Sequence, residues 1–486
     1  MLSQAKFLEL AAEYSVVPLT LEVVGDRETA VTVFEKLVGN DCGFLLESVE
    51  GGERWGRWSF VGWDAEFTLS STGGVSSVTG TTINVPDGDP LTVLEQLLGQ
   101  FHAPELPNLP PLHTGVVGYL GYDCVRYVER LPDRPEDDRG LPEQIWQFVG
   151  SMAALDRLRD TILLIRNVYV GDDPAAQYDA ARQDLETAAS RLGSGSEYRP
   201  QPVPDFAEVP AGATINLTQT DFEHAVERAI DYVYAGDVFQ VVPSLRVEVP
   251  FDGDAFAVYR VLRLINPSPY LFFFRDREVA IAGSSPELMV RARGGKVYSR
   301  PIAGTRPRGA TPALDLALEE ELLADPKERA EHVMLVDLAR NDLGRVSEFG
   351  SVSVDELMTI ERYSHVMHIV SGVSGTLRPD LGPVAVLRAT FPHGTVTGAP
   401  KVRAMEIIDE LEGSARGPYA GAVGYIDFSG NLDTAIALRS MVAKGDHAWV
   451  QAGAGVVADS DPSAEYQESL NKAAAVLAAI AAAHQI

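Results

Sequence analysis

The sequence predicts an α+β fold in which antiparallel sheets are flanked by helices. Helical and strand patterns are mixed along the 486 residues, but they do not alternate in a regular strand–helix–strand order. A doubly wound parallel fold needs that order, so its absence favours antiparallel sheets. The hydrophobic content of 45% and the charged content of 22% are typical of globular proteins and provide for a large core.

The first part of the chain, residues 1–192, is predicted to combine helices with a strand-rich stretch. Apolar residues at helical spacing indicate the helices, and clusters of aromatic and branched side chains indicate the strands. We expect helices near 3–14, 28–38 and 90–101, and strands at 44–46, at 58–61 and on entering 115–122. Residues 132–142, rich in proline and charge, are expected to form a surface loop.

Residues 193–212 are rich in Gly, Ser and Pro, a composition typical of linkers. We therefore expect an N-terminal domain of residues 1–192, a linker of residues 193–212, and a C-terminal domain of residues 213–486.

The C-terminal domain is predicted to begin with a helix and to continue with strands and long helices. Thr220, with Glu223 three residues later, fits a capping box at the start of the first helix, and Gly236 fits its end. Residues 237–242 are typical of a strand. Further strands are expected near 270–283 and 289–299, and helices near 315–345, 381–390, 398–412 and 463–483.

The chain is strongly acidic, with 40 Lys and Arg against 69 Asp and Glu and a formal net charge of −29. Such a charge repels nucleic acid and anionic membranes, so neither is expected as a partner. An anionic substrate would therefore have to be bound by a local basic pocket.

The two cysteines, Cys42 and Cys124, form no C-x-x-C motif, so neither a zinc ribbon nor a redox site is expected. They suit a reducing cytoplasm, which is the expected location. The N-terminal segment is amphipathic and unlike a secretion signal. The longest apolar stretch, residues 473–483, is too short to span a bilayer.

Two Glu-x-x-Glu pairs are candidate metal ligands, namely Glu328 with Glu331 and Glu465 with Glu468. A spacing of three places both carboxylates of a pair on one face of a helix. Either pair alone is most often a solvated surface, but two such faces brought together would form a site rich in anionic oxygen. Mg²⁺ prefers such ligands, so the sequence predicts a Mg²⁺ site.

His365 and His368 lie in an apolar segment, where a histidine is more often a core residue than a catalytic one. No third ligand with zinc spacing accompanies them, so a zinc site is not expected.

The run 298–309 contains Gly304, which has no Cβ and so permits close approach of the backbone to a ligand. Thr305, Arg306 and Arg308 add a hydroxyl and two guanidinium groups that suit carboxylates. Taken by itself, such a run is usually a turn.

Several segments together resemble the chorismate-utilising enzymes, and among these the large component of anthranilate synthases. The similar segments are residues 45–48, 56–62, 118–123, 236–242, 266–272, 283–287, 301–306, 336–346 and 394–405, followed by the last helix up to Lys472. The resemblance implies a layered sandwich of antiparallel sheets flanked by helices. It also implies that the N-terminal domain contributes a regulatory site and that the C-terminal domain binds chorismate and is catalytic.

The implied activity is that of a lyase that converts chorismate and ammonia into anthranilate and pyruvate, the first committed step of tryptophan biosynthesis. Glu287 matches the acid that protonates the departing C4 hydroxyl, a role that requires a raised pKa. His368 matches the histidine associated with the loss of pyruvate.

The resemblance also implies the residues that hold Mg²⁺ and substrate. Glu331 and Glu468 would hold Mg²⁺ directly, and the ion would bind the ring carboxylate and stabilise its charge. Glu328 and Glu465 would act through water. The positions expected to contact substrate are Gly304, Thr305, Thr395, Tyr419, Arg439, Lys472 and the backbone N–H groups of Gly453 and Gly455.

Two positions lack an amine that related enzymes use. In 4-amino-4-deoxychorismate synthases the position of Ala303 resembles a lysine that attacks the substrate ring, and alanine cannot attack. In isochorismate and salicylate synthases the position of Gln240 resembles a lysine that activates water. Ammonia is already nucleophilic, so the neutral Gln240 in the catalytic site fits an enzyme that uses ammonia.

The resemblance further implies a partner and an inhibitor. Neither cysteine lies in the glycine-rich elbow of a glutamine amidotransferase, so a separate amidotransferase subunit is expected to supply ammonia within a heterotetramer. L-tryptophan is expected as a feedback inhibitor. Its site is implied at Leu46, Glu47, Ser48, Pro269, Tyr270, Leu271 and Phe272, for which ordinary core strands are the alternative.

Two other functions stay open. One is a 2-amino-2-deoxyisochorismate synthase of a secondary-metabolite pathway, which stops before pyruvate is lost; His368 weighs against it. The other is a catalytically silent subunit that senses tryptophan, and Glu287, both glutamate pairs and Arg439 weigh against it. The chain also departs from the family pattern, with Trp58 at a usual tyrosine and His393 at a usually small residue.

Overall fold

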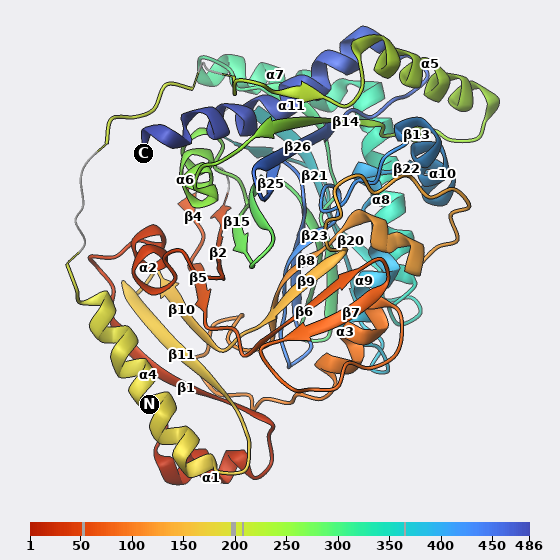
Figure 1. Cartoon of the computed structure of the whole chain (residues 1–486). Coiled ribbons are helices and arrows are strands. Elements are labelled where there is room, and N and C mark those ends of the chain that lie inside the picture. The colour runs from red at the N-terminus through yellow and green to blue at the C-terminus, as the bar shows by residue number, and fades with distance from the viewer. Residues whose placement is uncertain (51–53, 196–200, 207–208, 364–365) are drawn as a thin grey trace.

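The computed structural model describes residues 1–50, 54–195, 201–206, 209–363 and 366–486. They fold into layers in which two large sheets lie against each other and helices cover their outer faces (Figure 1). The strands of both large sheets pair antiparallel. The predicted α+β fold of antiparallel sheets flanked by helices is thereby confirmed.

The first sheet has eleven strands within the described ranges. Their spatial order is β1 (Val16–Val24), β11 (Thr161–Tyr169), β10 (Ser151–Asp156), β5 (Trp58–Trp63), β2 (Gly43–Glu47), β15 (Tyr270–Arg275), β16 (Ala280–Ser285), β25 (Ser440–Lys444), β26 (His447–Gly453), β14 (Ser244–Pro250) and β12 (Thr214–Ile215). Its outer face packs on helices α1 (Gln4–Ala11), α2 (Ala30–Leu37), α4 (Pro174–Leu192), α5 (Gln219–Ala235), α6 (Ala255–Ile265) and α11 (Pro462–Ala482).

The second sheet also has eleven strands in the part of the chain that the structure describes. They are β19 (Ile302–Pro307), β21 (Val366–Thr376), β18 (Lys296–Ser299), β17 (Leu288–Arg293), β24 (Leu432–Ile436), β23 (Ala422–Ile426), β8 (Val116–Leu120), β9 (Gln144–Phe148), β6 (Phe67–Thr72) and β7 (Val75–Thr79), with β20 (Ser353–Arg362) paired to β21. Its helices are α3 (Pro90–Leu98), α7 (Pro312–Ala324), α8 (Pro326–Gly344), α9 (Pro383–Thr390) and α10 (Lys401–Glu412).

Smaller elements complete the described chain. Two short ladders pair β3 (Val49–Glu50) with β4 (Arg54–Trp55) and β13 (Gln240–Val241) with β22 (Gly398–Ala399). The 3₁₀ turns are η1 (Tyr122–Tyr127), η2 (Gly394–Val396) and η3 (Ala483–Gln485).

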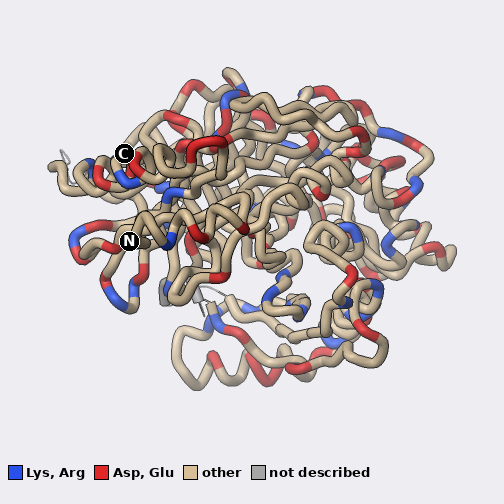
Figure 2. Tube along the Cα trace, turned by 90° about the horizontal axis from the view of Figure 1, so that it is seen from below, with Lys and Arg blue, Asp and Glu red and all other residues tan. Residues whose placement is uncertain are grey.

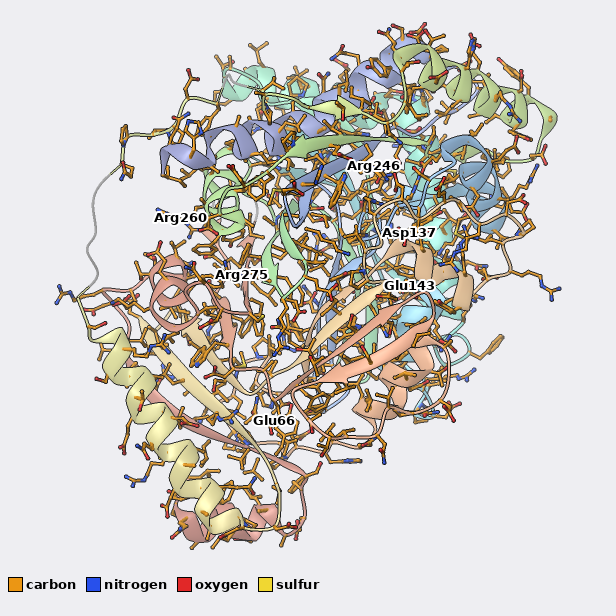
Figure 3. All side chains as sticks on the ribbon, viewed as in Figure 1. Glu66, Asp137, Glu143, Arg246, Arg260 and Arg275 are labelled. Carbon is orange, nitrogen blue, oxygen red and sulfur yellow. The ribbon has the colours of Figure 1, made fainter. Side chains whose placement is uncertain are left out.

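Both parts of the chain contribute strands to both sheets. In the first sheet β2 pairs with β15, and Leu46 lies opposite Phe272. In the second sheet β8 pairs with β23. Side chains fill the space between the sheets (Figure 3). Phe44 of the first sheet and Val423 of the second belong to one buried cluster. The described residues of 193–212 form no helix or strand, and the proposed domain limits stay a prediction.

The start of α5 differs from the predicted capping box. Thr218 caps the helix, and its hydroxyl accepts the Asp221 N–H at 3.2 Å while the Asp221 carboxylate accepts the Thr218 N–H at 3.3 Å. The prediction of Thr220 and Glu223 was therefore wrong by two residues, because a second Thr with an acidic residue three positions on precedes it. Gly236 ends the helix in the left-handed conformation, as predicted.

Two other predicted elements are shorter than expected. The strand expected at 237–242 is confined to Gln240–Val241, which pairs with Gly398–Ala399. The helix expected near 315–345 is two helices separated at Asp325. The Asp325 carboxylate accepts the Lys327 N–H at 3.0 Å and so starts α8 afresh.

Acidic and basic positions are interspersed along the chain trace (Figure 2). Searching the described residues for a helix long and apolar enough to cross a membrane finds none. Both cysteines are free, and Cys124 is buried.

One buried ion pair joins several elements. The Arg416 guanidinium donates to both oxygens of the Glu412 carboxylate, at 2.9 and 2.6 Å, and to the carbonyls of Val396 and Val242, at 2.7 and 2.6 Å. Only 1% of the Arg416 side chain and 4% of the Glu412 side chain are exposed. Removal of either partner would leave an unpaired charge in the core.

Replacing this arginine is expected to destabilise the fold. Arg416→Met should lower the free energy of unfolding by about 3–5 kcal/mol, because Glu412 is left buried without its cation. The matched control is Arg403→Met: Arg403 pairs with Asp237 and Glu406 at the surface, where its side chain is 36% exposed, and the loss should be below about 1 kcal/mol. Urea unfolding of the three proteins measures this, and equal losses for both variants would contradict it.

Candidate active site

A cavity of about 890 Å³ is lined by both α8 and α11. A smaller cavity of about 220 Å³ adjoins it. The two share the lining residues Pro286, Ile302, Ala303, Thr305, His368, Thr395, Arg439, Gly455 and Lys472. Every residue predicted to act in catalysis, substrate binding or metal binding lines one of these two cavities.

Glu287 lies between β16 and β17 and is 3% exposed. Burial raises the pKa of its carboxyl to about 8, although hydrogen bonds from Thr395 and from the backbone N–H of Ile302 act in the opposite direction. The Thr395 hydroxyl donates to Glu287 Oε1 at 2.9 Å. A carboxyl with this pKa holds its proton at neutral pH, so Glu287 can serve as a general acid.

His368 lies on β21 with its Nδ1 at 3.0 Å from the Gly304 carbonyl and at 3.0 Å from Thr305 Oγ1. Because a carbonyl only accepts, this geometry places the proton on Nδ1 and leaves Nε2 as the acceptor. Burial lowers the pKa of His368, so the neutral ring can take up a proton. Tyr363 packs edge-on against it, with 5.6 Å between ring centroids, and His365 lies outside the described residues.

Strand β19 enters the cavity through a bulge at Gly304. The φ angle of Gly304 is +68°, in the region that favours glycine. A Cβ at this position would lie 3.1 Å from Glu328 Oε2 and 3.1 Å from Leu322 Cδ1. The close approach predicted for this glycine is therefore an approach to the acidic helix α8.

Two basic side chains of the cavity, Arg439 and Lys472, differ in whether they pair with other residues of the protein. Among the described residues, the Arg439 guanidinium forms no hydrogen bond or ion pair, and burial lowers its pKa. Lys472 instead pairs with Glu468 at 2.7 Å and donates to the Gly453 carbonyl at 3.0 Å. Arg439, beside the buried Tyr419, is thus available to bind a carboxylate in the smaller cavity.

Arg306 and Arg308 do not serve as the substrate clamps that the sequence suggested. Arg306 pairs with Glu321, Asp325 and Glu328 at 2.9, 2.9 and 3.0 Å. Arg308 pairs with Asp315 at 2.9 Å. Sequence reasoning missed this because the acidic partners come from α7 and α8, which follow the run.

The carboxylates of α8 and α11 have the chemistry of a Mg²⁺ site. Burial, and then the nearby charge of Glu328, raise the pKa of Glu331. Burial and the charge of Glu468 raise the pKa of Glu465, against a hydrogen bond from Ser460. Crowded anionic oxygens of this kind suit a hard cation.

The same carboxylates do not converge on one point. Glu328 accepts a hydrogen bond from Arg306 at 3.0 Å, and Glu331 accepts one from Gln240 at 3.4 Å. In the part of the chain that the structure describes, no group of three or more His, Cys, Asp or Glu is placed to hold a metal ion. The residues present therefore fit Mg²⁺ in chemistry and in their shared cavity, with Arg306 and Lys472 occupying carboxylates that an ion would compete for.

Gln240 faces the acidic wall of the cavity. Its neutral amide offers no base for activating water, in keeping with the distinction drawn from the sequence. A Cβ at Gly455 would lie 2.5 Å from Gln240 Nε2, so the glycine leaves the space that this side chain occupies.

A separate cavity of about 260 Å³ is lined by six of the seven residues predicted to bind tryptophan, namely Leu46, Glu47, Ser48, Tyr270, Leu271 and Phe272. Pro269, the seventh, lines the large cavity instead. Glu47 is 4% exposed and accepts hydrogen bonds from Arg263 at 2.7 Å, Arg157 at 2.8 Å and Tyr259 at 2.8 Å.

Sequence reasoning missed several residues of the site, among them Lys327, Tyr363 and His393. Lys327 and Tyr363 line the large cavity, and His393 lies behind Thr395 with its Nδ1 3.1 Å from the Thr395 hydroxyl. His393 was noted only as a departure from a pattern, and its spacing of two from Thr395 could have indicated a local side-chain contact.

Comparisons with known proteins show the family to which the chain is similar. The model of the chorismate binding enzyme family matches residues 43–478. Anthranilate synthase component 1 of Acetivibrio thermocellus is 46% identical over 483 residues, which cover 98% of each chain. The crystal structure of anthranilate synthase component I from Streptococcus pneumoniae is similar with a TM-score of 0.78 and 36% identity, covering 94% of this chain and 98% of that one.

The fold is shared more widely. The menaquinone-specific isochorismate synthase of Escherichia coli has a TM-score of 0.73 at 19% identity and covers 98% of both chains. At that identity the likeness concerns the fold alone.

The proton on Glu287 has a consequence for stability. The ordinary pKa of 4.5 is raised to about 8 in the folded protein. Between these values the folded chain holds a proton that the unfolded chain has released, so this stabilisation is complete below pH 4.5 and is lost as pH rises through about 8. The loss is expected to reach at most about 1.4 kcal/mol per pH unit.

Glu287→Gln removes this titration and preserves shape. The unfolding free energy of the wild type minus that of the variant should fall steadily between pH 5 and pH 8. Urea unfolding of both proteins across this range measures it, since titrations elsewhere cancel in the difference. A difference that is constant with pH would contradict the raised pKa.

Proposed function

This chain belongs to the family of chorismate binding enzymes, and we propose that it is the synthase component of an anthranilate synthase. It would convert chorismate and ammonia into anthranilate and pyruvate. The observation that supports this most is the buried Glu287, which lines the same cavity as Arg439 and Ala303. Burial raises the pKa of Glu287 to about 8, and Arg439 forms no ion pair with any of the described residues. The cavity thus offers an acid and a carboxylate-binding group, while Ala303 supplies no amine nucleophile.

The first half of the reaction uses Arg439 and Glu287. Arg439, with Tyr419, holds a substrate carboxylate in the smaller cavity. Ammonia then forms a bond to C2 of the ring while the C4–O bond breaks, and Glu287 gives its proton to the departing hydroxyl, which leaves as water. Glu287 must carry its proton at the start of this step, and the pKa of about 8 that burial gives it favours that state at neutral pH.

The second half uses His368. Its unprotonated Nε2 accepts the proton from C2 as the enolpyruvyl C–O bond breaks, so that the ring becomes aromatic and pyruvate leaves. The Gly304 carbonyl holds Nδ1–H and thereby fixes the tautomer that this step requires.

A bound Mg²⁺ is part of the proposal. Glu331 and Glu468 would hold the ion directly, and Glu328 and Glu465 through water. When bound, it supplies positive charge for the ring carboxylate as electrons move toward it. The ion would compete with Lys472 for Glu468.

The name component 1 of the relatives implies a companion component. In our proposal this companion is a glutamine amidotransferase subunit that supplies ammonia within a heterotetramer. The two free cysteines support this. Burial raises the pKa of Cys42 and of Cys124, so both stay thiols, whereas an amidotransferase needs a thiolate nucleophile.

Feedback inhibition by tryptophan would act at the cavity of about 260 Å³. Leu46 and Phe272 form part of an apolar wall that suits an indole ring. The charged lining groups, which include Arg291 and Asp433, suit the polar end of an amino acid. Residues 265–269, which directly precede β15, line the large catalytic cavity. One continuous segment therefore lines both cavities.

The decisive test is turnover by the chain alone. Chorismate, Mg²⁺ and an ammonium salt at alkaline pH should give anthranilate with equimolar pyruvate, measured by chromatography with fluorescence detection and a coupled pyruvate assay. Glu287→Gln should lower kcat by roughly 10²-fold or more because the C4 hydroxyl then leaves without a proton.

Other products would identify the alternatives. A stable aminated intermediate without pyruvate would indicate a 2-amino-2-deoxyisochorismate synthase and would remove the proposed role of His368. Absence of turnover with intact tryptophan binding would indicate a silent sensor.

Removal of one metal ligand should weaken Mg²⁺ binding. Glu331→Gln is expected to raise the Kd for Mg²⁺ by at least roughly tenfold, because a neutral amide replaces an anionic ligand. Glu320→Gln, at an exposed position of the neighbouring helix α7, is the matched control. Isothermal titration with MgCl₂ and chorismate measures both, and equal affinities would contradict the assignment.

Filling the cavity of about 260 Å³ should weaken inhibition by tryptophan. Ser48→Phe is expected to weaken tryptophan binding by roughly tenfold or more, because the aromatic ring takes up space in the cavity. Turnover without tryptophan should persist, since Ser48 does not line the catalytic cavities. Unchanged inhibition in this variant would place the inhibitor elsewhere.

A further inference from the structure

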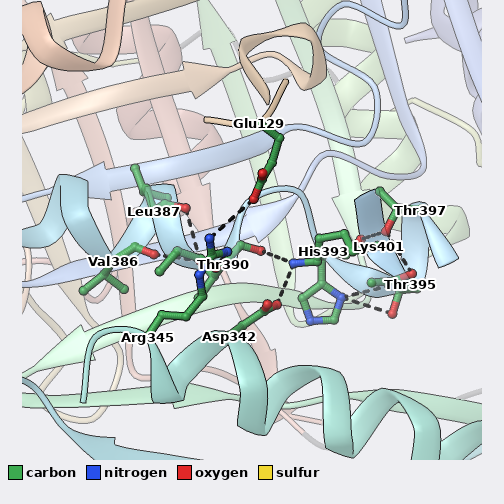
Figure 4. Close-up of polar contacts among 12 residues, drawn as sticks. Glu129, Asp342, Arg345, Val386, Leu387, Thr390, His393, Thr395, Thr397 and Lys401 are labelled. Atoms are coloured by element: carbon green, nitrogen blue, oxygen red, sulfur yellow. Dashed lines mark hydrogen bonds and ion pairs between the residues drawn. The ribbon is translucent and has the colours of Figure 1, made fainter. Parts of the chain in front are cut away.

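His393 occupies a buried position directly behind the acid of the active site. It caps the 3₁₀ turn η2, and it is 5% exposed. Its Nδ1 lies 3.3 Å from the Thr395 N–H and 3.1 Å from the Thr395 hydroxyl (Figure 4). The same hydroxyl lies 2.9 Å from Glu287 Oε1. Histidine, threonine and glutamate therefore form a continuous chain of polar contacts.

The protonation state of the ring follows from these contacts. A backbone N–H only donates, so His393 Nδ1 must hold a lone pair and the proton of the ring lies on Nε2. Burial, and then the charge of Lys401, lower the pKa of His393 to about 3, so the ring is neutral throughout the physiological range. Lys401 is itself fixed by Asp342 at 2.6 Å and the Thr390 carbonyl at 3.2 Å, contacts that Figure 4 also shows.

The Thr395 hydroxyl has one proton and two acceptors. When Glu287 is ionised, the hydroxyl donates to the carboxylate. When Glu287 is protonated, its O–H can donate to Thr395 Oγ1 only if the hydroxyl proton turns elsewhere, and His393 Nδ1 is the acceptor within reach. His393 itself is 3.7 Å from Glu287 Oε1, too far for a direct hydrogen bond.

Resting on the proposed function, which makes Glu287 the acid, we propose that His393 is a positioning residue that accepts the Thr395 hydroxyl proton whenever Glu287 carries its own. It thereby completes the hydrogen bonds of the protonated Glu287 carboxyl and keeps Glu287 protonated for the next turnover. A small residue at this position would leave the hydroxyl proton with Glu287 as its acceptor, which favours the ionised carboxylate instead.

The other groups that face Glu287 are the same in the wild type and in the His393 variants. His368, Arg439, Lys472 and Tyr419 line the same cavity, and Tyr363 lies close enough to interact electrostatically with Glu287. Among the described residues, none of them forms a hydrogen bond or ion pair with His393, so the polar route from His393 to Glu287 runs through Thr395.

The test follows the proton on Glu287 in two ways. Infrared difference spectroscopy detects the C=O stretch of the protonated carboxyl, assigned by its loss in Glu287→Gln, and needs no turnover. The pH dependence of kcat/KM for chorismate, at a fixed concentration of un-ionised ammonia, reports the same group during catalysis.

His393→Ala should lower the pKa of Glu287, and with it the alkaline limb of the rate profile, by roughly 0.5–1 pH unit, the worth of one neutral hydrogen bond. His393→Asn should preserve both, because its Oδ1 can replace Nδ1 as the acceptor. In a Thr395→Val background, His393→Ala should cause no further shift.

Two results would overturn the assignment. One is an equal shift in His393→Asn and His393→Ala, and the other is a uniform loss of rate in His393→Ala with an unmoved infrared titration, which indicates a purely structural role. If the wild type produces no anthranilate, the proposed function fails, and the infrared titration still decides whether His393 controls the proton on Glu287.

Discussion

The active site depends on the buried ion pair between Arg416 and Glu412. One guanidinium joins α10, the turn η2 through the Val396 carbonyl, and the segment before β14 through the Val242 carbonyl. Glu412 also accepts the N–H and hydroxyl of Ser244, both at 2.7 Å. Thr395 lies next to Val396 and Gln240 lies two residues before Val242, so this charge pair connects the segments that carry two residues of the candidate site. Such a pair stabilises only when every donor and acceptor is satisfied, which is the condition this site meets.

The strong acidity of the chain limits how an anionic substrate can be bound. With a net charge of −29, most arginines are needed to balance nearby carboxylates, and Arg306 and Arg308 are examples. Arg439 differs because, among the described residues, its buried guanidinium forms no ion pair, although the charge of Glu468 acts on it from a distance. The charge of Arg439 therefore acts on a bound carboxylate at short range and at low dielectric. Its attraction there outweighs the repulsion from the distant acidic surface, which solvent and salt screen.

The sequence was most informative for features that depend on interactions between residues close together in the chain. Helical periodicity located α2, α9 and α11 closely, and Gly236 was identified as a helix end because few residues adopt its left-handed conformation. The pairing of β2 with β15 could not be read from periodicity, since a strand pattern does not specify a partner more than two hundred residues away. The site residues came from family resemblance, whereas the local contacts of His393 and the pairing of Arg306 required coordinates, because a polar side chain does not reveal which of many partners it satisfies.

The hairpin of β15 and β16 connects the two cavities. Phe272, in the wall of the proposed regulatory cavity, lies opposite Gly283, and a Cβ at Gly283 would overlap its ring. Strand β16 ends at Ser285, whose hydroxyl contacts the Glu287 backbone N–H at 3.3 Å. A ligand that displaced Phe272 would also displace β16, the strand that leads to Glu287. This is expected because Phe272 and Gly283 are closely packed, with no space between them. The proposed inhibition would then need no large domain movement, because a small shift of this hairpin would change the distance between Glu287 and Thr395.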